Sequence, residues 1–308
     1  MRASVVICTL NRSQALTRGL RALEAQTGVA PEQAELVVVD NGSTDETPTV
    51  VKEFRRYARF PVRWCVEERL GLSNARNRGV AEARHELVVF LDDDAVPTPG
   101  WLAAHIATAD ETHADCVGGR ITLAWEAPRP AWLHPALDPF LGRIDLGDER
   151  GAFDFPHTYP GGGNIAFRRA VFGQVGLFDP ALGVRPGRVV GSEETDLCYR
   201  IERAGGRLVY EPRAHVTHPV PAGKLTKQWF RRRAYHAGRT ACLVELRHFS
   251  RGALLARNLP RVFTRRRSAG GVVAASAPSM AARLFLAEFR LLFAVGYLRE
   301  LLRPTRPR

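Results

Sequence analysis

Three consecutive carboxylates, Asp92, Asp93 and Asp94, stand out in this sequence for the chemistry they could do. They directly follow an apolar run at 88–91, which is typical of a strand buried on both faces. Adjacent negative charges repel one another and are costly to bury, so this ending favours a bound cation. In an extended chain Asp92 and Asp94 point to the same side, as two oxygen ligands of a hard divalent cation would. From the triplet alone, a solvated acidic turn is an equally good interpretation.

A second acidic cluster comprises Glu193, Glu194 and Asp196, at the start of a predicted helix. Carboxylates are favoured in the first turn of a helix by its dipole, so this cluster alone does not establish a site. His218 follows a predicted strand that begins near residue 208. A single histidine of this kind is either a structural residue or a metal ligand.

The elements that must position these residues alternate between strand and helix. Strand-like segments, each separated from the next by a helical pattern or a helix-start signal, lie at 4–9, 36–40, 62–66 and 86–91. This alternation predicts an α/β fold with a doubly wound, mostly parallel sheet and helices on both faces. Ligands of such sheets bind outside the carboxyl ends of the strands. Thr9, Asp40 and the Asp92–Asp94 triplet all lie at predicted carboxyl ends, so we expect them to share one site.

The middle of the chain carries weaker signals. Residues 116–124 resemble a further strand, and 125–160 form a long segment rich in proline, tryptophan and glycine. Its aromatic side chains either stack on a sugar or cover the core, and the second interpretation is favoured. Gly161, Gly162 and Gly163 permit a close approach of backbone to a ligand. The sequence contains no GxxxxGK[ST], no GxGxxG after its first strand and no GxSxG, so P-loop, dinucleotide and nucleophile-elbow sites are unsupported.

Length and composition indicate an ordinary globular protein with a sizeable core. The 308 residues are 45% hydrophobic and 25% charged. The five cysteines are far apart and form no CxxC pair, which argues against a zinc site or a disulfide framework and indicates a reducing compartment. The net charge is +12, but residues 251–308 hold twelve arginines, two glutamates and no lysine, a net charge of +10. The first 250 residues are therefore nearly neutral, and no nucleic-acid-binding signature accompanies the basic end, so a nucleic-acid partner is not predicted.

The composition shifts near residue 221, which divides an expected domain at 1–220 from a basic, mostly helical region at 221–308. The stretch 281–302 is rich in leucine and phenylalanine, but interspersed charges exclude an ordinary transmembrane span. These charges scatter around a helical wheel, so it is not a clean amphipathic helix either. Arginine clusters beside apolar residues suit peripheral binding to an anionic membrane, while a docked helix or an oligomer contact is nearly as good an explanation. We expect a cytoplasmic protein, or one peripheral to the cytoplasmic membrane face.

Taken together and in order, these motifs resemble the family 2 glycosyltransferases, which have the GT-A fold. Each motif is weak alone, but the ordered set is specific, and it spans residues 1 to about 220. The segments that carry the resemblance are 5–12, 38–45, 71–77, 91–94, Gly163-Asn164, 193–197 with Arg200, and His218.

The resemblance implies an inverting, metal-dependent transferase. It would move a sugar from a nucleotide-diphosphate donor, a UDP-sugar by default, to the hydroxyl of a glycan, lipid-linked or secondary-metabolite acceptor. Asp92 and Asp94 match the DxD motif that holds Mg²⁺ or Mn²⁺, and His218 would complete the metal shell. Glu194 matches the catalytic base; because the pair here is Glu-Glu where the family usually has Glu-Asp, Glu193 stays an alternative.

The remaining site residues also follow from the resemblance. Asp196 belongs to the same catalytic cluster as the two glutamates. Asp40 would bond the nucleobase, and Asp93 would contact the ribose or the sugar. The full donor-binding set is Thr9, Asn11, Arg12, Asp40, Asn41, Arg76, Asn77, Asp93, Gly163 and Asn164.

Two other function classes compete with this one. A sugar-phosphate nucleotidyltransferase is also an α/β, metal-dependent enzyme, but no glycine- and arginine-rich triphosphate loop lies near the N-terminus. A non-catalytic nucleotide-sugar-binding membrane scaffold would have no need for the carboxylates that this chain retains.

Overall fold

The computed structural model describes residues 1–153, 158–185, 191–258 and 279–303. Its strands are β1 Ala3–Thr9, β2 Ala34–Asp40, β3 Val62–Val66, β4 Leu87–Leu91, β5 Val96–Pro97, β6 Cys116–Trp125, β7 Gly151–Ala152, β8 Asn164–Arg168 and β9 Leu208–Val220. Its α-helices are α1 Ser13–Glu24, α2 Thr47–Phe54, α3 Leu72–Glu82, α4 Trp101–Thr112, α5 Val171–Val175, α6 Glu193–Arg203, α7 Lys227–His248, α8 Arg251–Asn258 and α9 Met280–Leu301. Short 3-10 segments are η1 Pro31–Gln33, η2 Pro135–Leu141 and η3 Ala222–Lys224.

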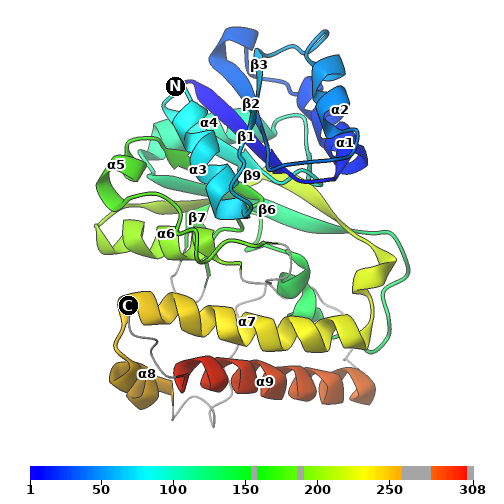
Figure 1. Cartoon of the computed structure of the whole chain (residues 1–308), viewed down its shortest axis with the longest axis vertical. Helices are drawn as coiled ribbons and strands as arrows, with labels where there is room; N and C mark the ends of the chain where they lie inside the picture. The colour runs from blue at the N-terminus through cyan, green and yellow to red at the C-terminus, as the bar shows by residue number, and fades with distance from the viewer. Residues whose placement is uncertain (154–157, 186–190, 259–278, 304–308) are drawn as a thin grey trace.

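The nine strands form one sheet in the order β3-β2-β1-β4-β8-β6-β9-β5, with β7 paired to β9 (Figure 1). The first four strands of this order run parallel, as the alternating pattern predicts. The antiparallel strand β8 then lies between β4 and β6, and β6 runs parallel to β9. The predicted α/β, GT-A-type sheet is confirmed, with a mixed half added beyond β4.

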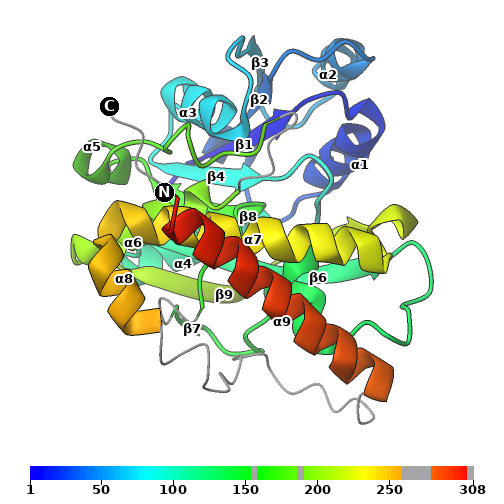
Figure 2. The same cartoon turned by 60° about the horizontal axis from the view of Figure 1, so that its bottom comes forward.

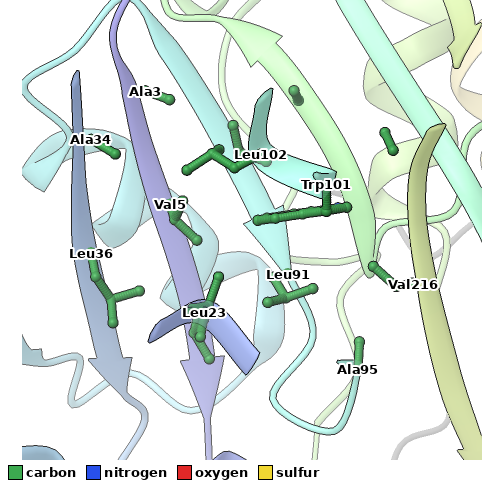
Figure 3. Close-up of a cluster of buried hydrophobic side chains, with 14 of the residues drawn as sticks. Ala3, Val5, Leu23, Ala34, Leu36, Leu91, Ala95, Trp101, Leu102 and Val216 are labelled. Atoms are coloured by element: carbon green, nitrogen blue, oxygen red, sulfur yellow. The ribbon is translucent and has the colours of Figure 1, made fainter. Parts of the chain in front are cut away.

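Helices cover both faces of the sheet because side chains alternate along each buried strand. Val5 and Ile7 of β1 join a core with α1, α2 and α4, while Val6 faces a second core with α3, α5 and α6. In the first core, Trp101 and Leu102 of α4 lie over the sheet close to Leu91 (Figure 3). The end of β4 is thereby held by apolar packing from both sides, which fixes the carboxylates that follow it.

A C-terminal helical region extends the fold, as expected. Helices α7 and α9 lie side by side and run in the same direction, with α7 between α9 and the sheet (Figures 1 and 2). Trp132 from the long 125–160 segment packs against Phe230 of α7 and Phe285 of α9, with ring centroids 5.7 and 4.8 Å apart. Phe140 likewise packs against Phe289 at 4.5 Å. These two aromatic side chains of the segment therefore cover a hydrophobic cluster, which was the favoured interpretation.

Within the described residues, no helix combines the length and the apolar character that crossing a membrane requires. All five cysteines are free.

Candidate active site

The carboxyl ends of β1, β2 and β4 meet at one edge of the sheet. Thr9 pairs in register with Asp40, and Asn41 N donates to Thr9 O at 2.9 Å. Thr9 Oγ1 donates to Asp93 Oδ2 at 2.8 Å, which joins the end of β1 to the carboxylate triplet. The predicted convergence of Thr9, Asp40 and the triplet is confirmed.

The triplet does not continue the extended strand, and that premise of the sequence argument is wrong. Strand β4 ends at Leu91, and Ala95 N donates to Asp92 O at 3.1 Å, which closes a turn. Arg12 then binds both of the following carboxylates, with Nη1 to Asp93 Oδ1 at 2.8 Å and Nη2 to Asp94 Oδ2 at 2.5 Å. Asp93 and Asp94 are consequently buried against one cation, whereas the Asp92 side chain is 40% exposed.

Burial raises the pKa of Asp93 to about 7, although Arg12 opposes this shift. Asp94 is different, because its Oδ1 is buried and has no hydrogen-bond partner among the described residues. His218 Nε2 lies 3.6 Å from that oxygen, and burial lowers the pKa of His218, so its imidazole is mostly neutral at neutral pH. Asp94 Oδ1 and His218 Nε2 thus face each other at a distance too long for a hydrogen bond, and His218 Nδ1 is also buried without a partner among the described residues.

No group of three or more carboxylate, imidazole or thiol side chains is gathered as a ready-made metal site in the part of the chain that the structure describes. Magnesium-type sites in phosphate-handling enzymes need fewer, because the ion usually takes one or two carboxylates and completes its shell with substrate phosphates and water. The orphaned Asp94 Oδ1 and the neighbouring His218 fit that kind of ion, and the metal contact expected of the exposed Asp92 stays a prediction.

Arg76 of α3 connects the triplet to the second acidic cluster. Its side chain is almost fully buried beside the contacting rings of Phe90 and Phe178, whose centroids each lie 5.7 Å from the guanidinium carbon. Nη1 lies 2.5 Å from Glu193 Oε1, and Nη2 lies 3.5 Å from Asp92 Oδ1. A buried guanidinium needs such partners, so Arg76 holds two carboxylate groups from distant segments at a fixed separation.

The glycines at 161–163 serve this arrangement. Gly162 O accepts a hydrogen bond from Arg76 Nη2 at 2.8 Å, and a Cβ on Gly162 would lie 2.7 Å from the same nitrogen. A Cβ on Gly163 would overlap Asp92 Oδ2. The close backbone approach that these glycines predict is therefore made to Asp92 and Arg76, and the donor contact expected of Gly163 stays a prediction.

Glu193 and Glu194 differ in their surroundings although they are adjacent. Glu193 is buried and its carboxylate is engaged by Arg76. The Glu194 side chain is 18% exposed, and its Oε2 lies 3.9 Å from Arg76 Nη1. Burial and the charge of Glu193 raise the pKa of Glu194 to about 7, against the opposing effect of Arg76. Glu194 is thus the member of the pair that is open to a ligand and titrates near neutral pH.

Three other expected site residues lie at packing positions. Asp196 accepts from Arg200 Nε at 2.9 Å and pairs with His248 Nε2 at 2.8 Å, which ties α6 to α7. Asn77 exchanges two hydrogen bonds with the backbone of Phe178, both 2.9 Å. Asn164 is fully buried in the sheet, where its Oδ1 accepts from Trp101 Nε1 at 2.7 Å.

The expected nucleobase region is shaped by backbone hydrogen bonds. Asn11 Oδ1 accepts from Thr44 N at 2.7 Å, and Asn41 Oδ1 accepts from Gly71 N at 2.7 Å. Asp40 Oδ1 accepts from Ser43 N at 2.7 Å, while no hydrogen bond to its Oδ2 occurs among the described residues. The asparagines therefore hold the loops in place, and Asp40 keeps an oxygen free for a ligand N–H.

Two cations near the site were not found from the sequence. Lys224 of η3 is close enough to Asp94 for that carboxylate to oppose the lowering of the Lys224 pKa by burial. Arg233 of α7 has a buried Nε without a hydrogen-bond partner, and the charge of Glu194 opposes the lowering of its pKa by burial. Neither side chain has a carboxylate within ion-pair distance in the described ranges. The run 231–233 was visible as a basic segment, but only the docking of α7 shows which arginine faces inward.

Comparisons with known proteins identify the family and the fold of the chain. Residues 4–176 match the family model described as glycosyl transferase family 2. A glucosyl-dolichyl phosphate glucuronosyltransferase of Haloferax volcanii is 29% identical over 250 residues, which cover 80% of this chain and 78% of that protein. A pre-mycofactocin glycosyltransferase of Mycobacterium tuberculosis is 33% identical over 197 residues, 60% of this chain but only 39% of that protein.

Solved structures show the same fold. The mannosyltransferase PcManGT from Pyrobaculum calidifontis, in complex with GDP-Man and Mn²⁺, superposes with a TM-score of 0.62 at 20% identity and covers 98% of this chain and 87% of that one. The S. aureus protein TarS 1-349, in complex with UDP-GlcNAc, superposes with a TM-score of 0.57 at 16% identity and covers 97% and 91%.

The sheet with its acidic edge is that of a GT-A-type glycosyltransferase. The chain belongs to glycosyl transferase family 2. Membership of a sugar-transferring family favours glycosyl transfer over the nucleotidyltransferase and non-catalytic alternatives.

Proposed function

We propose that this chain is an inverting, metal-dependent glycosyltransferase that moves a sugar from a nucleotide-diphosphate donor to an acceptor hydroxyl. The observation that carries the proposal is the buried Asp94 Oδ1, which has no partner among the described residues and lies 3.6 Å from a neutral imidazole. Leaving such an oxygen without a partner costs free energy that a bound cation removes.

Asp92, Asp94 and His218 would hold the ion, Mg²⁺ or Mn²⁺. When bound, a divalent cation stabilises the negative charge that builds on the departing diphosphate. Arg12 keeps Asp93 and Asp94 in place, and Arg76 does the same for Asp92. The Mn²⁺ in the complex of the archaeal mannosyltransferase with its GDP-sugar supports this assignment.

Glu194 would take the proton of the acceptor hydroxyl. As the new bond forms between the acceptor oxygen and the anomeric carbon, the bond from that carbon to the diphosphate oxygen breaks, and the proton passes to Glu194. A carboxyl with a pKa near 7 is well matched to this role at neutral pH. Glu194 is on α6 and the proposed metal carboxylates follow β4, and a base on a different segment from the metal ligands is compatible with attack from the face opposite the leaving group, with inversion.

The C-terminal region, residues 221–308, would contribute to the same site. Lys224 and Arg233 are cations without an ion-pair partner in the described part of the chain, and both face the acidic clusters. They would attract the donor diphosphate or a phosphate on the acceptor. Residues 1–220 would thus form the transferase domain, and η3 and α7 would complete its active site.

The nucleobase would lie beside Asp40 and Thr9, with Asp93 near the ribose or sugar. A UDP-sugar is the first donor to test, since a neighbour of this fold binds UDP-GlcNAc, and GDP-Man is the second. The acceptor is proposed to be a glycan, a lipid-linked sugar or a small molecule. The dolichyl-phosphate-linked substrate in the name of the Haloferax relative supports the lipid-linked class, and with it a peripheral position at the cytoplasmic face of a membrane.

A panel of donors tests the proposal. Thermal unfolding is measured with UDP-glucose, UDP-glucuronate, UDP-GlcNAc and GDP-mannose, each with and without Mn²⁺. One donor should raise the melting temperature only when Mn²⁺ is present, because a ligand at about a hundred times its Kd stabilises the folded state by about 2.7 kcal/mol. The matched control Asp148→Asn, at a 94% exposed carboxylate, should respond as the native chain does. The proposal fails if no donor shifts the transition, or if the shift is the same with chelator.

A further inference from the structure

Helix α9 has two apolar faces on opposite sides, which explains why its charges scatter on a helical wheel. One face docks against α7 through buried residues that include Phe285, Phe289 and Gly296. The opposite face is apolar as well, and it is exposed. This outer stripe consists of Met280, Leu284, Leu291, Val295, Leu298 and Leu302, whose side chains recur every three, four or seven positions and are 40–71% exposed.

Arginines border the outer stripe along both edges. With 3.6 residues per turn, Arg283 and Arg290 lie on one side of the stripe, and Arg299 and Arg303 lie on the other. The two acidic residues of α9 are neutralised from α7, since Arg231 Nε lies 2.5 Å from Glu288 Oε1. Glu300 is buried and likewise pairs with Arg239 at 2.8 Å, and Arg303 makes a longer contact of 3.6 Å with its other oxygen. The exposed face of α9 is therefore an apolar strip between two positive edges.

Close backbone packing between α7 and α9 holds the outer stripe in place. A Cβ on Gly238 of α7 would overlap Phe293 O of α9, and a Cβ on Gly296 would overlap Tyr235 O. The backbones of the two helices are therefore in close contact at these glycines. Figures 1 and 2 show that α9 is the outermost layer, with α7 between it and the sheet. The stripe faces away from the active site and from the core.

We propose that the outer stripe of α9 lies in the headgroup layer of an anionic membrane, parallel to its surface. Apolar side chains enter the boundary between headgroups and acyl chains, while arginines at both edges contact lipid phosphates. A second copy of the chain is a poorer occupant, because pairing two stripes would place the arginine edges of two highly basic regions against each other. The inference deepens the peripheral membrane location proposed above, and it names the surface that makes the contact.

Vesicle flotation of the full-length chain, without donor or acceptor, tests this surface. Native protein is mixed with phosphatidylcholine vesicles that contain either no anionic lipid or about one third phosphatidylglycerol. We expect binding to the anionic vesicles alone, weakening with added salt. The double variant Leu284→Gln/Leu291→Gln should reduce partitioning by about tenfold or more, because both side chains are 65% exposed and would enter the bilayer interface. Arg283→Gln/Arg290→Gln should reduce it by about tenfold.

A matched control replaces two exposed apolar residues on other faces, Tyr57→Gln/Leu177→Gln, and should bind as the native chain does. The proposal is overturned if native protein does not float with anionic vesicles, or if the stripe variant floats as well as the native protein, which would assign binding to another segment. The proposal is also overturned if light scattering shows that the native chain is a dimer and the stripe variant is a monomer. Donor-dependent thermal shifts of the stripe variant should be unchanged, so loss of membrane binding and failure of the transferase proposal give different results.

Discussion

The Asp92–Asp94 triplet and the Glu193–Asp196 cluster each contain three carboxylates paired with two arginines, but the two groups distribute that charge differently. In the triplet, Arg12 engages Asp93 and Asp94 together, and one oxygen of Asp94 is left without a partner among the described residues. In the second cluster, separate partners neutralise Glu193 and Asp196, and Glu194 alone is only loosely paired. The pKa of one carboxyl is raised to about 7 in each cluster, Asp93 in the first and Glu194 in the second. The clusters differ in what is left open: an unpartnered Asp94 oxygen suited to a cation in the first, and the partly exposed Glu194 carboxyl suited to a proton in the second.

This difference indicates which carboxylates take part in the chemistry and which stabilise the fold. Glu193 is paired with the buried Arg76, and Asp196 with the partly buried Arg200 and His248, so they position Arg76 and the helices α6 and α7. Asp92, Asp94 and Glu194 have incomplete partners and lie at the same edge of the sheet. Within each cluster, incomplete pairing marks the residue that a substrate or an ion would complete.

The largest effect is expected from Asp94→Asn. Removing this charge takes away a proposed metal ligand whose stabilisation of the departing diphosphate is worth several kcal/mol, so sugar transfer should fall by about a thousandfold or more. Steady-state transfer with saturating Mn²⁺ measures the effect. The control Asp148→Asn should keep native activity. Near-native turnover in Asp94→Asn would contradict the proposal that the Asp92–Asp94 triplet binds a metal ion.

Substitutions of the two adjacent glutamates should affect different properties: that of Glu194 the activity, and that of Glu193 the stability. Glu194→Gln should lower kcat by at least about a hundredfold, because a positioned base typically contributes about 10²–10⁴-fold. Glu193→Gln should instead lower the free energy of unfolding by about 3 kcal/mol, because it leaves the buried Arg76 without its main partner. Urea unfolding and transfer assays on both variants check this. If Glu193→Gln lost turnover while staying fully stable, the two roles would have to be exchanged.

A pH dependence follows from Glu194. Its pKa is about 7 in the folded chain against an ordinary 4.5, so folding favours its protonated form. Its contribution to stability is therefore complete below pH 4.5 and is lost as pH rises through 7. Glu194→Gln should be more stable than the native chain by about 1–3 kcal/mol at pH 8 and equally stable near pH 4.5. Transfer by the native chain should decline as pH falls below 7, and unfolding curves at the two pH values test the stability difference.

The smallest effect is expected from Asp196→Asn. The change weakens the links to Arg200 and His248, so the free energy of unfolding should fall by about 1–2 kcal/mol. Turnover should stay within about tenfold of native, because Glu194 keeps its own surroundings. A loss as large as that of Glu194→Gln, in protein that remains folded, would place Asp196 in the chemistry.

The sequence predicted the parallel strands and the meeting of Thr9, Asp40 and the triplet, because strand ends and periodicity are local properties. It left open whether the triplet is extended or forms an acidic turn, since three carboxylates are compatible with either, and the turn places Asp93 and Asp94 against Arg12, a partner distant in sequence. Asp196 and Glu194 look equivalent in sequence, and only the packing of α7 on α6 shows that one of them meets His248. The two faces of α9 were hidden for the same reason: periodicity reports apolar positions, but it does not tell which of them have a partner.

The glycine crossing of α7 and α9 has a consequence for the choice of acceptor. Because Gly238 and Gly296 bring the two helices into backbone contact, α9 cannot slide along α7 without placing side chains where there is no room. The distance between Arg233, on the active-site side of α7, and the outer stripe of α9 is therefore fixed. On a membrane, such an enzyme would select acceptors by the distance of their hydroxyl from the lipid phosphates. Only a hydroxyl at the distance of the active site would meet Glu194, whichever sugar carries it.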